Sequence, residues 1–589
     1  MFHKLRGLII EFIKKEPPRR ELMRPEPEKK STRIKQNLTF TSLSPYLVFF
    51  LFAVSMLSLS GSCKTGFSDE NPAKENKQRA PATASESVPL DNESTRETAS
   101  AREQSAHFTD ITVFHTSDEH GWLEPTIPPR DDKIRGGAAN FLSWIVEKEG
   151  FDPGSFLLLS SGDNWTGPAV STWFEGRPMV EVFNLMGYDG VAIGNHEFDF
   201  GRAVMIQRFD ESIAPFLGAN IVETGTGRPA FFAGPYVIRR FQSVNVGIIG
   251  LANIDTRTGS HPLFSMDLDF KGYAETLNHY VPEVRGDGAE VVIVLAHECR
   301  KPLAEALSEI DVKVDAVFGA HCHDISVGRV AGVPLIESGW GMRSYSKLTL
   351  RYDHRRQSVV DTIAESVKVE YPEGEPNPVS PDPDVKKIVQ SWREKTGYFT
   401  NEVMGYTKTG IIKASWAMAN WVTDAWLRAF PEADGVIAVF GGMRQSIGTG
   451  AIKMGDIFGM LPFENSLVIV TLSGAELYKV LTFATTSCEL RKRCYPALGG
   501  MSFNISPQES EIKFSNGREF SMHEEYTIVV SDFMYFGGSN YPIRQSPEAD
   551  LTGVNWRDPV VEWTRNIKSD KNAPLESFLD PTPRIQPEP

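Results

Sequence analysis

Acids, amides and histidines recur directly after short apolar runs in this sequence. The segment GNHEFDFG at 194–201 follows the run YDGVAI, so Asn195, His196, Glu197 and Asp199 stand where a buried strand would end. Such side chains are costly to bury unless they bind a ligand or one another. Four further runs end similarly, in DEH at 118–120, GDN at 162–164, AHE at 296–298 and GAHCH at 319–323. We expect these endings to converge on one site, because ligands bind beyond the carboxyl ends of strands in open α/β sheets.

The residue types in these endings favour a metal centre. Imidazole suits zinc, iron, copper and nickel, whereas carboxylate and amide oxygens suit magnesium, calcium and manganese. The mixture, without a cage of thiolates, suggests manganese, zinc or iron with open coordination positions. Seven candidate ligands are too many for one ion: Asp118, His120, Asp163, Asn195, His297, His321 and His323. They fit two divalent ions sharing one aspartate, and two ions about 3.5–4 Å apart can clamp the attacking and leaving oxygens of a phosphoryl displacement.

The elements that would position these residues can be predicted from the pattern of the chain. Order is expected to begin near 109, and from there to 365 runs such as SFLLLSSGDN and VNVGIIGLAN alternate with longer amphipathic stretches. This alternation predicts buried strands separated by helices, and therefore a layered α/β domain. Residues 366–399 begin proline-rich and continue with a helical pattern, which indicates a linker and an interdomain helix. A second α/β domain is expected over 400–570, followed by a tail at 571–589.

The ordered blocks DEHG, GDN, GNHEFD, AHE and GAHCH resemble the five motifs of the calcineurin-like metallophosphoesterases. The segments FHTSDEHG, RGGAA, GNHEFDFG, FLGANI and GIIGL are similar to the exported 5′-nucleotidase and UDP-sugar hydrolase branch of that family. Any one motif is weak, but five in the right order form a specific signal. The resemblance spans roughly 109–570. It implies a four-layer metallophosphoesterase sandwich followed by a smaller α/β substrate-binding domain.

The resemblance also implies how the ligands divide between two sites that share Asp163. One ion would be held by Asp118, His120, Asp163 and His323. The other would be held by Asp163, Asn195, His297 and His321. A lone asparagine such as Asn195 would more often cap a helix, and a lone buried His297 would more often be a satisfied core histidine. The ligand interpretation is preferred because these residues recur together.

His196 and Asp199 resemble the catalytic pair of the family. The histidine would stabilise charge on the phosphoryl oxygens or protonate the leaving oxygen, and the aspartate would orient its ring. The nucleophile would be a metal-bound hydroxide. Glu119 and Glu197 are interpreted as structural.

Segments of the second domain, among them LPFEN and VVSDFMYFGGSNY, resemble the substrate-binding domain of the family. Four residues match its substrate contacts: the rings of Phe463 and Phe533, and the arginines Arg444 and Arg428. A stacked base contributes about 1–3 kcal/mol whatever its identity. The alternative for Phe463 is an ordinary core residue.

The substrate-binding segments depart from the family at two positions. Val439 stands where the family has an asparagine, and Ser539 stands where it has an aspartate that accepts hydrogen bonds from ribose. The sequence therefore supports the hydrolytic centre more firmly than the identity of the substrate.

The leading hypothesis is a hydrolase that converts 5′-nucleotides to nucleoside and phosphate. The alternatives are the same chemistry on UDP-sugars, cyclic nucleotides or a non-nucleoside phosphate ester, and a non-catalytic binding lipoprotein on the same fold. The net charge of −15 argues against a nucleic-acid polymer as partner, because that surface would need a basic stripe. The oligomeric state is left open.

The N-terminal region predicts export. Tyr46–Cys63 is an apolar run of signal-peptide length that ends in LSGSC and resembles a lipobox, so 1–63 is interpreted as a signal segment with Cys63 as the lipid-anchored residue of a periplasmic or cell-surface lipoprotein. Cleavage without lipidation and an uncleaved anchor are the alternatives. Residues 64–108 are polar and predict a disordered tether. An exported chain permits disulfides, and both Cys488 with Cys494 and Cys299 with Cys322 are left open as bonded pairs or free thiols.

Overall fold

The computed structural model describes residues 107–586 except 129–130, 488–493 and 507–509. All of these residues belong to one compact unit. The predicted signal segment with Cys63, nearly all of the predicted tether, and Cys488 lie outside the described residues. Within the described ranges, no helix combines the length and the apolar character that a membrane span requires.

The first half of the described chain is built on two six-stranded sheets. One sheet has the order β15-β14-β1-β3-β4-β5, with β1 at Phe108–Thr116, β3 at Leu157–Ser160, β4 at Gly190–Ala192, β5 at Phe216–Leu217, β14 at Ser344–Asp353 and β15 at Ser358–Lys368. The other has the order β12-β13-β11-β10-β8-β7, with β7 at Tyr236–Phe241, β8 at Val244–Leu251, β10 at Val291–Ala296, β11 at Ala316–Gly319, β12 at Ile325–Val330 and β13 at Val333–Ser338. In the first sheet the neighbouring strands β1-β3-β4-β5 are parallel. In the second sheet the neighbouring strands β8-β10-β11-β13 are parallel.

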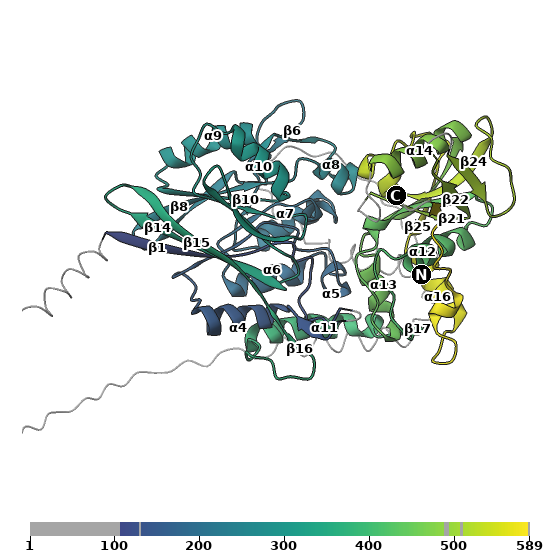
Figure 1. The fold of residues 1–589 in the computed structure, drawn as a ribbon, viewed down its shortest axis with the longest axis horizontal. Helices are drawn as coiled ribbons and strands as arrows, with labels where there is room; N and C mark the ends of the chain where they lie inside the picture. The colour runs from purple at the N-terminus through teal and green to yellow at the C-terminus, as the bar shows by residue number, and fades with distance from the viewer. Residues whose placement is uncertain (1–106, 129–130, 488–493, 507–509, 587–589) are drawn as a thin grey trace, which may run out of the picture. The chain divides into compact units, whose positions relative to one another are not determined.

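The two sheets pack face to face and helices cover their outer faces. Side chains alternate along a strand, so Ile111 and Val113 of β1 point to the core between the sheets while Phe114 points to the outer core. Helices α4 (Ala138–Glu149), α6 (Arg177–Met186) and α7 (Arg202–Glu211) cover the first sheet, and α9 (Tyr273–Gly286) and α10 (Arg300–Glu309) cover the second (Figure 1). This arrangement of helices, sheet, sheet and helices confirms the predicted four-layer sandwich.

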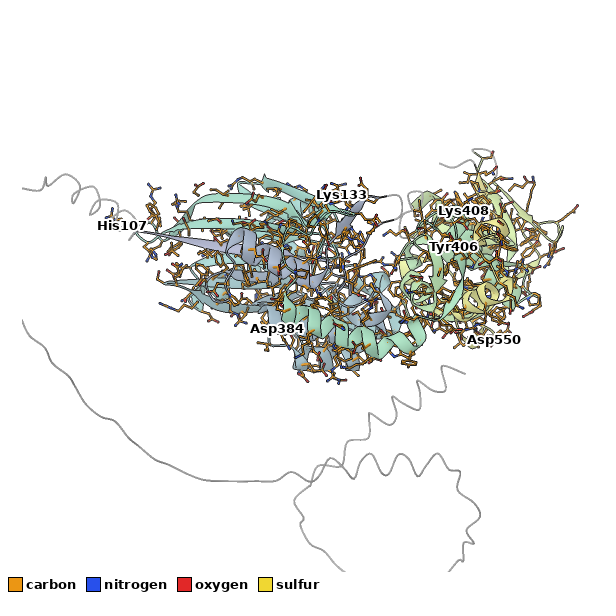
Figure 2. All side chains as sticks on the ribbon, turned by 90° about the horizontal axis from the view of Figure 1, so that it is seen from below. His107, Lys133, Asp384, Tyr406, Lys408 and Asp550 are labelled. Atoms are coloured by element: carbon orange, nitrogen blue, oxygen red, sulfur yellow. A yellow bond between two sulfur atoms is a disulfide. The ribbon has the colours of Figure 1, made fainter. Side chains whose placement is uncertain are left out.

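Helix α11, Pro383–Thr400, follows the proline-rich segment. Asp382 caps it by accepting hydrogen bonds from the backbone N–H groups of Asp384 and Val385, and proline at the first helical position needs no partner for an N–H. Asp384 lies on the exposed first turn (Figure 2). Val385 and Val389 pack in the core of the first half, whereas Phe399 at the end of the helix packs in the core of the second half.

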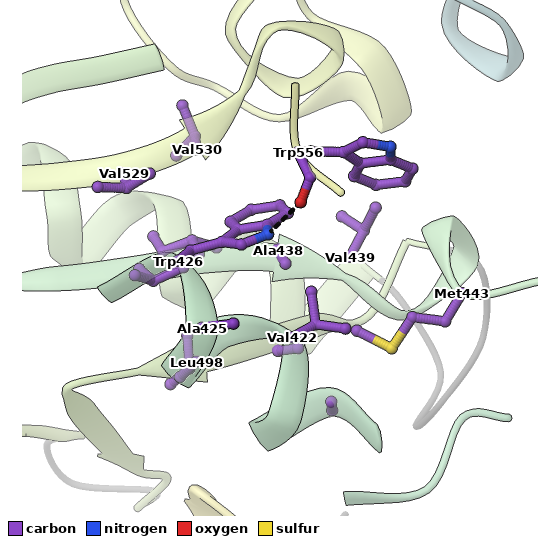
Figure 3. Close-up of a cluster of buried hydrophobic side chains, with 14 of the residues drawn as sticks. Val422, Ala425, Trp426, Ala438, Val439, Met443, Leu498, Val529, Val530 and Trp556 are labelled. Atoms are coloured by element: carbon purple, nitrogen blue, oxygen red, sulfur yellow. Dashed lines mark hydrogen bonds between the residues drawn. The ribbon is translucent and has the colours of Figure 1, made fainter. Parts of the chain in front are cut away.

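The second half contains a five-stranded sheet with the order β21-β18-β24-β20-β25. Its strands are β18 at Gly435–Val439, β20 at Ser466–Ser473, β21 at Pro496–Gly499, β24 at Glu525–Ser531 and β25 at Asp550–Asn555. Its helices are α12 at Trp416–Ala429, α13 at Met454–Met460, α14 at Gly474–Ser487 and α16 at Asp558–Ile567. Trp426 of α12 packs against Ala438 and Val439 of β18 in the core (Figure 3).

Short elements complete the fold. The small sheets pair β2 (Lys133–Arg135) with β16 (Glu370–Pro372), β6 (Ile221–Glu223) with β9 (Leu268–Phe270), β17 (Val403–Thr407) with β19 (Gly450–Lys453), and β22 (Met501–Asn504) with β23 (Glu511–Phe514) and β26 (Ile585–Gln586). The short helices are α5 (Ala169–Thr172), η1 (His196–Phe198), α8 (Thr256–Gly259), η2 (Pro262–Phe264), η3 (Phe440–Gly442), α15 (Asp532–Tyr535), η4 (Gly538–Asn540) and η5 (Leu575–Phe578). Both η1 and α8 follow carboxyl ends of the parallel strands, where the predicted site residues lie.

Candidate metal centre and substrate pocket

The structure brings the predicted metal ligands together at the carboxyl ends of β1, β3, β4, β10 and β11. Three groups of side chains could each hold a metal ion, with ligand atoms inside a group no more than 4.8 Å apart: Asp118, His120 and His323; His120, Asp163 and His196; Asp163, His297 and His321. Asp163 occurs in two of these groups. Its Oδ2 lies 2.9 Å from Nε2 of His297 and 3.9 Å from Nε2 of His120, as a carboxylate shared by two ions would.

Asn195 supplies the seventh predicted ligand. Its amide N–H donates to the carbonyl of Gly259 at 3.1 Å, which turns the amide oxygen the other way. That Oδ1 is buried and has no hydrogen-bond partner among the described residues. A buried acceptor without a donor is costly, so this oxygen fits a metal ion better than it fits the surrounding protein.

Histidine orientation at the site is fixed by backbone carbonyls. Nδ1 of His297 lies 2.7 Å from the carbonyl oxygen of Ser161, and Nδ1 of His120 lies 3.1 Å from that of Thr166. A carbonyl can only accept, so in each ring Nδ1 carries the proton when the imidazole is neutral and Nε2 presents its lone pair to the site. Such partners are typical of metal-binding histidines.

The backbone of the ligand residues is strained. Asp118, His120, Asp163, His321 and His323 have φ angles of 51°, 46°, 60°, 68° and 62°. This left-handed region costs most residues with a side chain roughly 1–2 kcal/mol. Strained backbone clusters at active and ligand-binding sites, so its concentration on five of the seven predicted ligands points to a functional site.

Two buried glutamates tie the ligand loops together. Glu197 accepts hydrogen bonds from the backbone N–H groups of Asp163, Asn164 and Gly194 at 2.9, 2.7 and 2.7 Å. Glu119 accepts from the Asn164 amide at 2.6 Å and from the Ser160 hydroxyl. Burial raises the pKa of Glu119 to about 7, and burial together with the nearby charge of Asp163 raises that of Glu197 to about 8. Both glutamates therefore hold the loops rather than reach the site.

Asp163 and His297 shift each other's pKa in opposite directions when no metal ion is bound. Burial alone would raise the pKa of Asp163, but the positive histidines, led by His297, hold it well below its usual range. Burial alone would lower the pKa of His297, but the carboxylate of Asp163 outweighs it and raises that pKa to about 10. Without bound metal, the carboxylate of Asp163 and protonated His297 thus form an ion pair.

This ion pair predicts how the metal-free protein responds to pH. The pKa of His297 is raised above its ordinary value of 6.5 to about 10, so its stabilising contribution is fully present below pH 6.5 and is lost as pH rises through 10. The raised pKa of Glu197 acts in the same direction between 4.5 and about 8. We expect the unfolding temperature of the chelator-treated protein to fall by several degrees between pH 6.5 and 10, measured by thermal unfolding.

Asp163→Asn is the control for this pH dependence, because the neutral amide removes the charge that raises the pKa of His297. The variant should show a smaller decrease over the same pH range. An unfolding temperature that rises toward pH 10 in the unmodified metal-free protein would contradict the prediction.

His196 and Asp199 form a hydrogen-bonded pair beside the metal ligands. Nδ1 of His196 lies 2.7 Å from Oδ2 of Asp199, whose Oδ1 accepts from the hydroxyl of Ser260 at 3.0 Å. The other ring nitrogen, Nε2, faces the ligands and lies 3.9 Å from Oδ2 of Asp163. The hydrogen bond at Nδ1 thus fixes the orientation of the His196 ring, and Nε2 faces the metal ligands.

A cavity of about 150 Å³ opens from this pair. Three of the four predicted substrate-binding residues line it: Arg444, Phe463 and Phe533. The ring of Phe463 stacks on that of His196 with centroids 5.4 Å apart, and a guanidinium nitrogen of Arg444 lies 3.2 Å from Nε2 of His120. The structure does not bring Arg428 to the cavity. Its guanidinium lies over the ring of Trp563 at 4.9 Å, because position 428 of α12 turns away from the face that buries Trp426.

The end of the cavity around Val439 is apolar. Val439 lies beside Trp556 in the core cluster, and the indole N–H of Trp426 donates to the carbonyl of Trp556 at 2.9 Å (Figure 3). The indole N–H of Trp556 donates in turn to the carbonyl of Phe463 at 2.8 Å, which fixes the loop that carries the stacking ring. Both departures from the family, Val439 and Ser539, line the cavity.

Sequence reasoning missed Ser260, His261 and Trp556 as cavity residues. Nδ1 of His261 is buried without a hydrogen-bond partner among the described residues, and its Nε2 lies 3.7 Å from Oδ2 of Asp532. The position of Ser260 and His261 in the sequence could have indicated this role. Their segment TGSHPLF comes after the strand GIIGL, and the carboxyl end of that strand lies at the same sheet edge as the metal ligands.

The four-layer sandwich and the convergent aspartates, asparagine and histidines define a metallophosphoesterase with a second α/β part that completes the cavity. Residues 399–545 match the family model of the 5′-nucleotidase C-terminal domain. The chain is 25% identical to Protein UshA of Yersinia enterocolitica, over 80% of this chain and 92% of that protein. It is 22% identical to Endonuclease YhcR of Bacillus subtilis over 73% of this chain, which spans only 37% of the Bacillus protein.

Solved structures agree with the fold. The crystal structure of a 5′-nucleotidase precursor from Thermus thermophilus superposes with a TM-score of 0.70 at 20% identity, over 81% of this chain and 99% of that one. The predicted resemblance to the exported 5′-nucleotidase and UDP-sugar hydrolase family is therefore confirmed, and with it the class of enzyme, a metallophosphoesterase-type hydrolase.

Proposed function

We propose that the protein is a phosphoesterase dependent on two divalent metal ions that hydrolyses 5′-nucleotides to nucleoside and phosphate. The observation that carries the proposal is the position of the His196–Asp199 pair between the metal ligands and a cavity lined by two phenylalanine rings. Manganese, zinc or iron suits the mixed donor set best. One ion would be held by Asp118, His120, Asp163 and His323, and the other by Asp163, Asn195, His297 and His321.

The ions would polarise the phosphoryl group and lower the pKa of a bound water. The chain's own residues do the rest. His196 points Nε2 at the place where a phosphate would lie between the ligands and the cavity, so it can stabilise developing charge or donate a proton to the leaving oxygen. Asp199, itself held by Ser260, keeps the ring in that orientation. Arg444, which lines the cavity beside His120, adds a positive charge there.

The cavity supports a ring-bearing leaving group. Phe463 and Phe533 can stack on any base, which gives affinity without base identity. Val439 and Ser539 remove an amide and a carboxylate from this cavity, and this observation favours a second candidate, hydrolysis of a ring-bearing phosphate ester that is not a nucleotide. UDP-sugars belong to the same test, since they too present a ring and a phosphate.

Replacing Phe533 tests the stacking role most cleanly, because Phe463 also contacts His196. The loss of one stacking ring costs about 1–3 kcal/mol, so Phe533→Ala should lower kcat/KM for nucleotides by about 5- to 150-fold. Hydrolysis of glycerol phosphate, which has no ring to stack, should change little. Steady-state kinetics on both substrates would measure the difference.

Phe231→Ala is the matched control, because that phenylalanine is 77% exposed and does not line the cavity. It should leave both substrates unaffected. Equal losses of the two substrates in Phe533→Ala would argue against stacking.

Export and anchoring complete the proposal. The apolar segment Tyr46–Cys63 supports an exported protein held at a membrane through lipid on Cys63. A relative 22% identical over 81% of this chain is named Cell wall protein Lmo0130, from Listeria monocytogenes, which agrees with a location outside the cytoplasm.

Phosphate release by the purified protein tests the function. The protein would be stripped of metal, resupplied with manganese, zinc or iron, and offered 5′-nucleotides, UDP-glucose, cyclic nucleotides and an aryl phosphate. Metal-dependent release that favours a 5′-nucleotide is the expected result. Release from the aryl phosphate alone would favour the second candidate, and no release with any metal would refute both.

A further inference from the structure

A disulfide joins the two loops that carry the histidine ligands of the second sheet. Cys299 and Cys322 are bonded, with their Cα atoms 5.3 Å apart. Cys299 follows β10 two residues after His297, and Cys322 follows β11 between His321 and His323. One covalent bond thus connects three of the candidate ligands.

The loop on the Cys299 side is firmly anchored. Glu298 is buried and accepts hydrogen bonds from the Tyr273 hydroxyl at 2.5 Å, the Asn253 amide at 3.0 Å and the backbone N–H of Cys299 at 2.8 Å. These contacts tie it to α9 and to the end of β8. Cys299 is also the N-cap residue of α10, so its Cα is fixed by a helix.

The loop on the Cys322 side lies at the surface. Cys322 is exposed, His321 and His323 are partly exposed, and the next apolar residue, Ile325, is 46% exposed. No residue from 321 to 325 is buried. Both histidines have left-handed backbone conformations, with φ of 68° and 62°. The loop is held by the hydrogen bond from the backbone N–H of His321 to Asp118 and by the stacking of His323 on Trp340. Little apolar burial adds to these contacts, and the covalent bond to Cys299 supplies a further restraint on the strained backbone.

We propose that the Cys299–Cys322 disulfide is a positioning device for both metal ions. It holds His321 and His323, which serve different ions, in strained conformations that present their nitrogens to the site. The inference rests on the proposed metal centre. Loss of the bond is expected to lower the stability of the fold, because a disulfide restricts the unfolded chain, and also to weaken the binding of each ion.

The device makes metal loading depend on the redox compartment. Closing the bond removes two protons and two electrons from the thiols, and a protein disulfide takes them up as it becomes two thiols. In a reducing cytoplasm the ligands stay loosely held, and after export into an oxidising compartment the sites are completed. The hydrolase would then acquire its metals where cytoplasmic nucleotides are out of reach.

The test compares the full-length protein with Cys299→Ser, Cys322→Ser and the double variant. Manganese and zinc affinities would be measured by competition with a chromophoric chelator, and unfolding temperature on metal-free samples. Changing groups that orient metal ligands typically costs 10- to 100-fold in affinity, and we expect a loss in this range for both ions. The metal-free unfolding temperature should also fall, because the disulfide restricts the unfolded chain. The double variant should be no weaker than either single variant, since each removes the same bond.

Two controls separate positioning from general stability. Leu307→Ala empties a core position two turns along α10 and should lower the unfolding temperature without changing metal affinity. A phosphine reductant added to the folded unmodified protein should reproduce the loss of metal affinity. The same treatment should not change the metal affinity of the double variant.

Equal metal affinities in the unmodified protein, the serine variants and the reduced protein would overturn this inference and leave the proposed function intact. Failure of the unmodified protein to bind metal would overturn the metal centre and the inference with it.

Discussion

Asp163→Asn is expected to remove most metal binding and to lower phosphate-ester hydrolysis by more than about 10⁴-fold, a larger loss than one acid–base side chain accounts for. The carboxylate lies within 3.9 Å of Nε2 of His120, His196 and His297, so its charge acts on both proposed ion positions. Asparagine keeps the shape and can still accept the backbone N–H of His196, which lies 2.8 Å from Oδ1. It also tolerates the left-handed backbone at φ 60° better than alanine would.

Metal content and turnover should fall together in this variant. Bound metal would be measured by elemental analysis of the dialysed protein, and turnover with each metal in excess. The circular dichroism spectrum should be unchanged, which shows that the fold survives. Full metal content in Asp163→Asn would contradict the shared-ligand role.

His196→Ala has the second-largest expected effect. A positioned acid–base group typically contributes 10²–10⁴-fold to rate, so kcat for nucleotides should fall in this range. Metal content should stay at the level of the unmodified protein, because Asn195, which precedes this histidine, offers its own oxygen to the metal site. Kinetics and metal analysis on the same sample would show the two results side by side.

The choice of substrate separates the two possible roles of His196. If the histidine protonates the leaving oxygen, an aryl phosphate, whose leaving group departs readily as an anion, should lose much less rate than a nucleotide. If it stabilises the phosphoryl oxygens, the rates for the aryl phosphate and the nucleotide should fall by similar factors. Asp199→Asn is the companion variant. Its kcat should fall less than that of His196→Ala, because the imidazole ring of His196 remains. Unchanged kcat in His196→Ala would remove the pair from the mechanism.

The metal centre was predictable because its residues follow the strands that carry them. Asp118, Asp163 and His297 each come within a few residues of the end of an apolar run, and parallel strands in a sheet end at the same edge; the ligands come from that edge of both sheets. The apolar runs themselves determined the layers, since residues such as Val113 and Val294 are fully buried on one face or the other. Local sequence thus carries both the fold and the position of the ligands.

The substrate cavity was less predictable because its residues do not follow that rule. His261 lies in a loop whose contact with Asp532 joins positions far apart in the chain, and no local pattern specifies such a pairing. Arg428 matched a family position but lies on an exposed helix face, since two residues beyond buried Trp426 a helix has turned away from its core. The pairing of Cys299 with Cys322 was likewise open, because spacing alone does not determine which thiols meet.

The left-handed backbone at five ligand positions has a consequence for lineages that lose the activity. Once metal binding is no longer selected, a metal ion no longer offsets the roughly 1–2 kcal/mol of backbone strain at the partly exposed His321 and His323. Glycine, which adopts such conformations freely, then becomes the more stable choice. His321 and His323 should therefore drift toward glycine in descendants that keep this sandwich only for binding, whereas Asp163 still pairs with His297 and with the backbone of His196. Glycine at these positions would indicate, from sequence alone, that a homologue has lost metal-dependent hydrolysis.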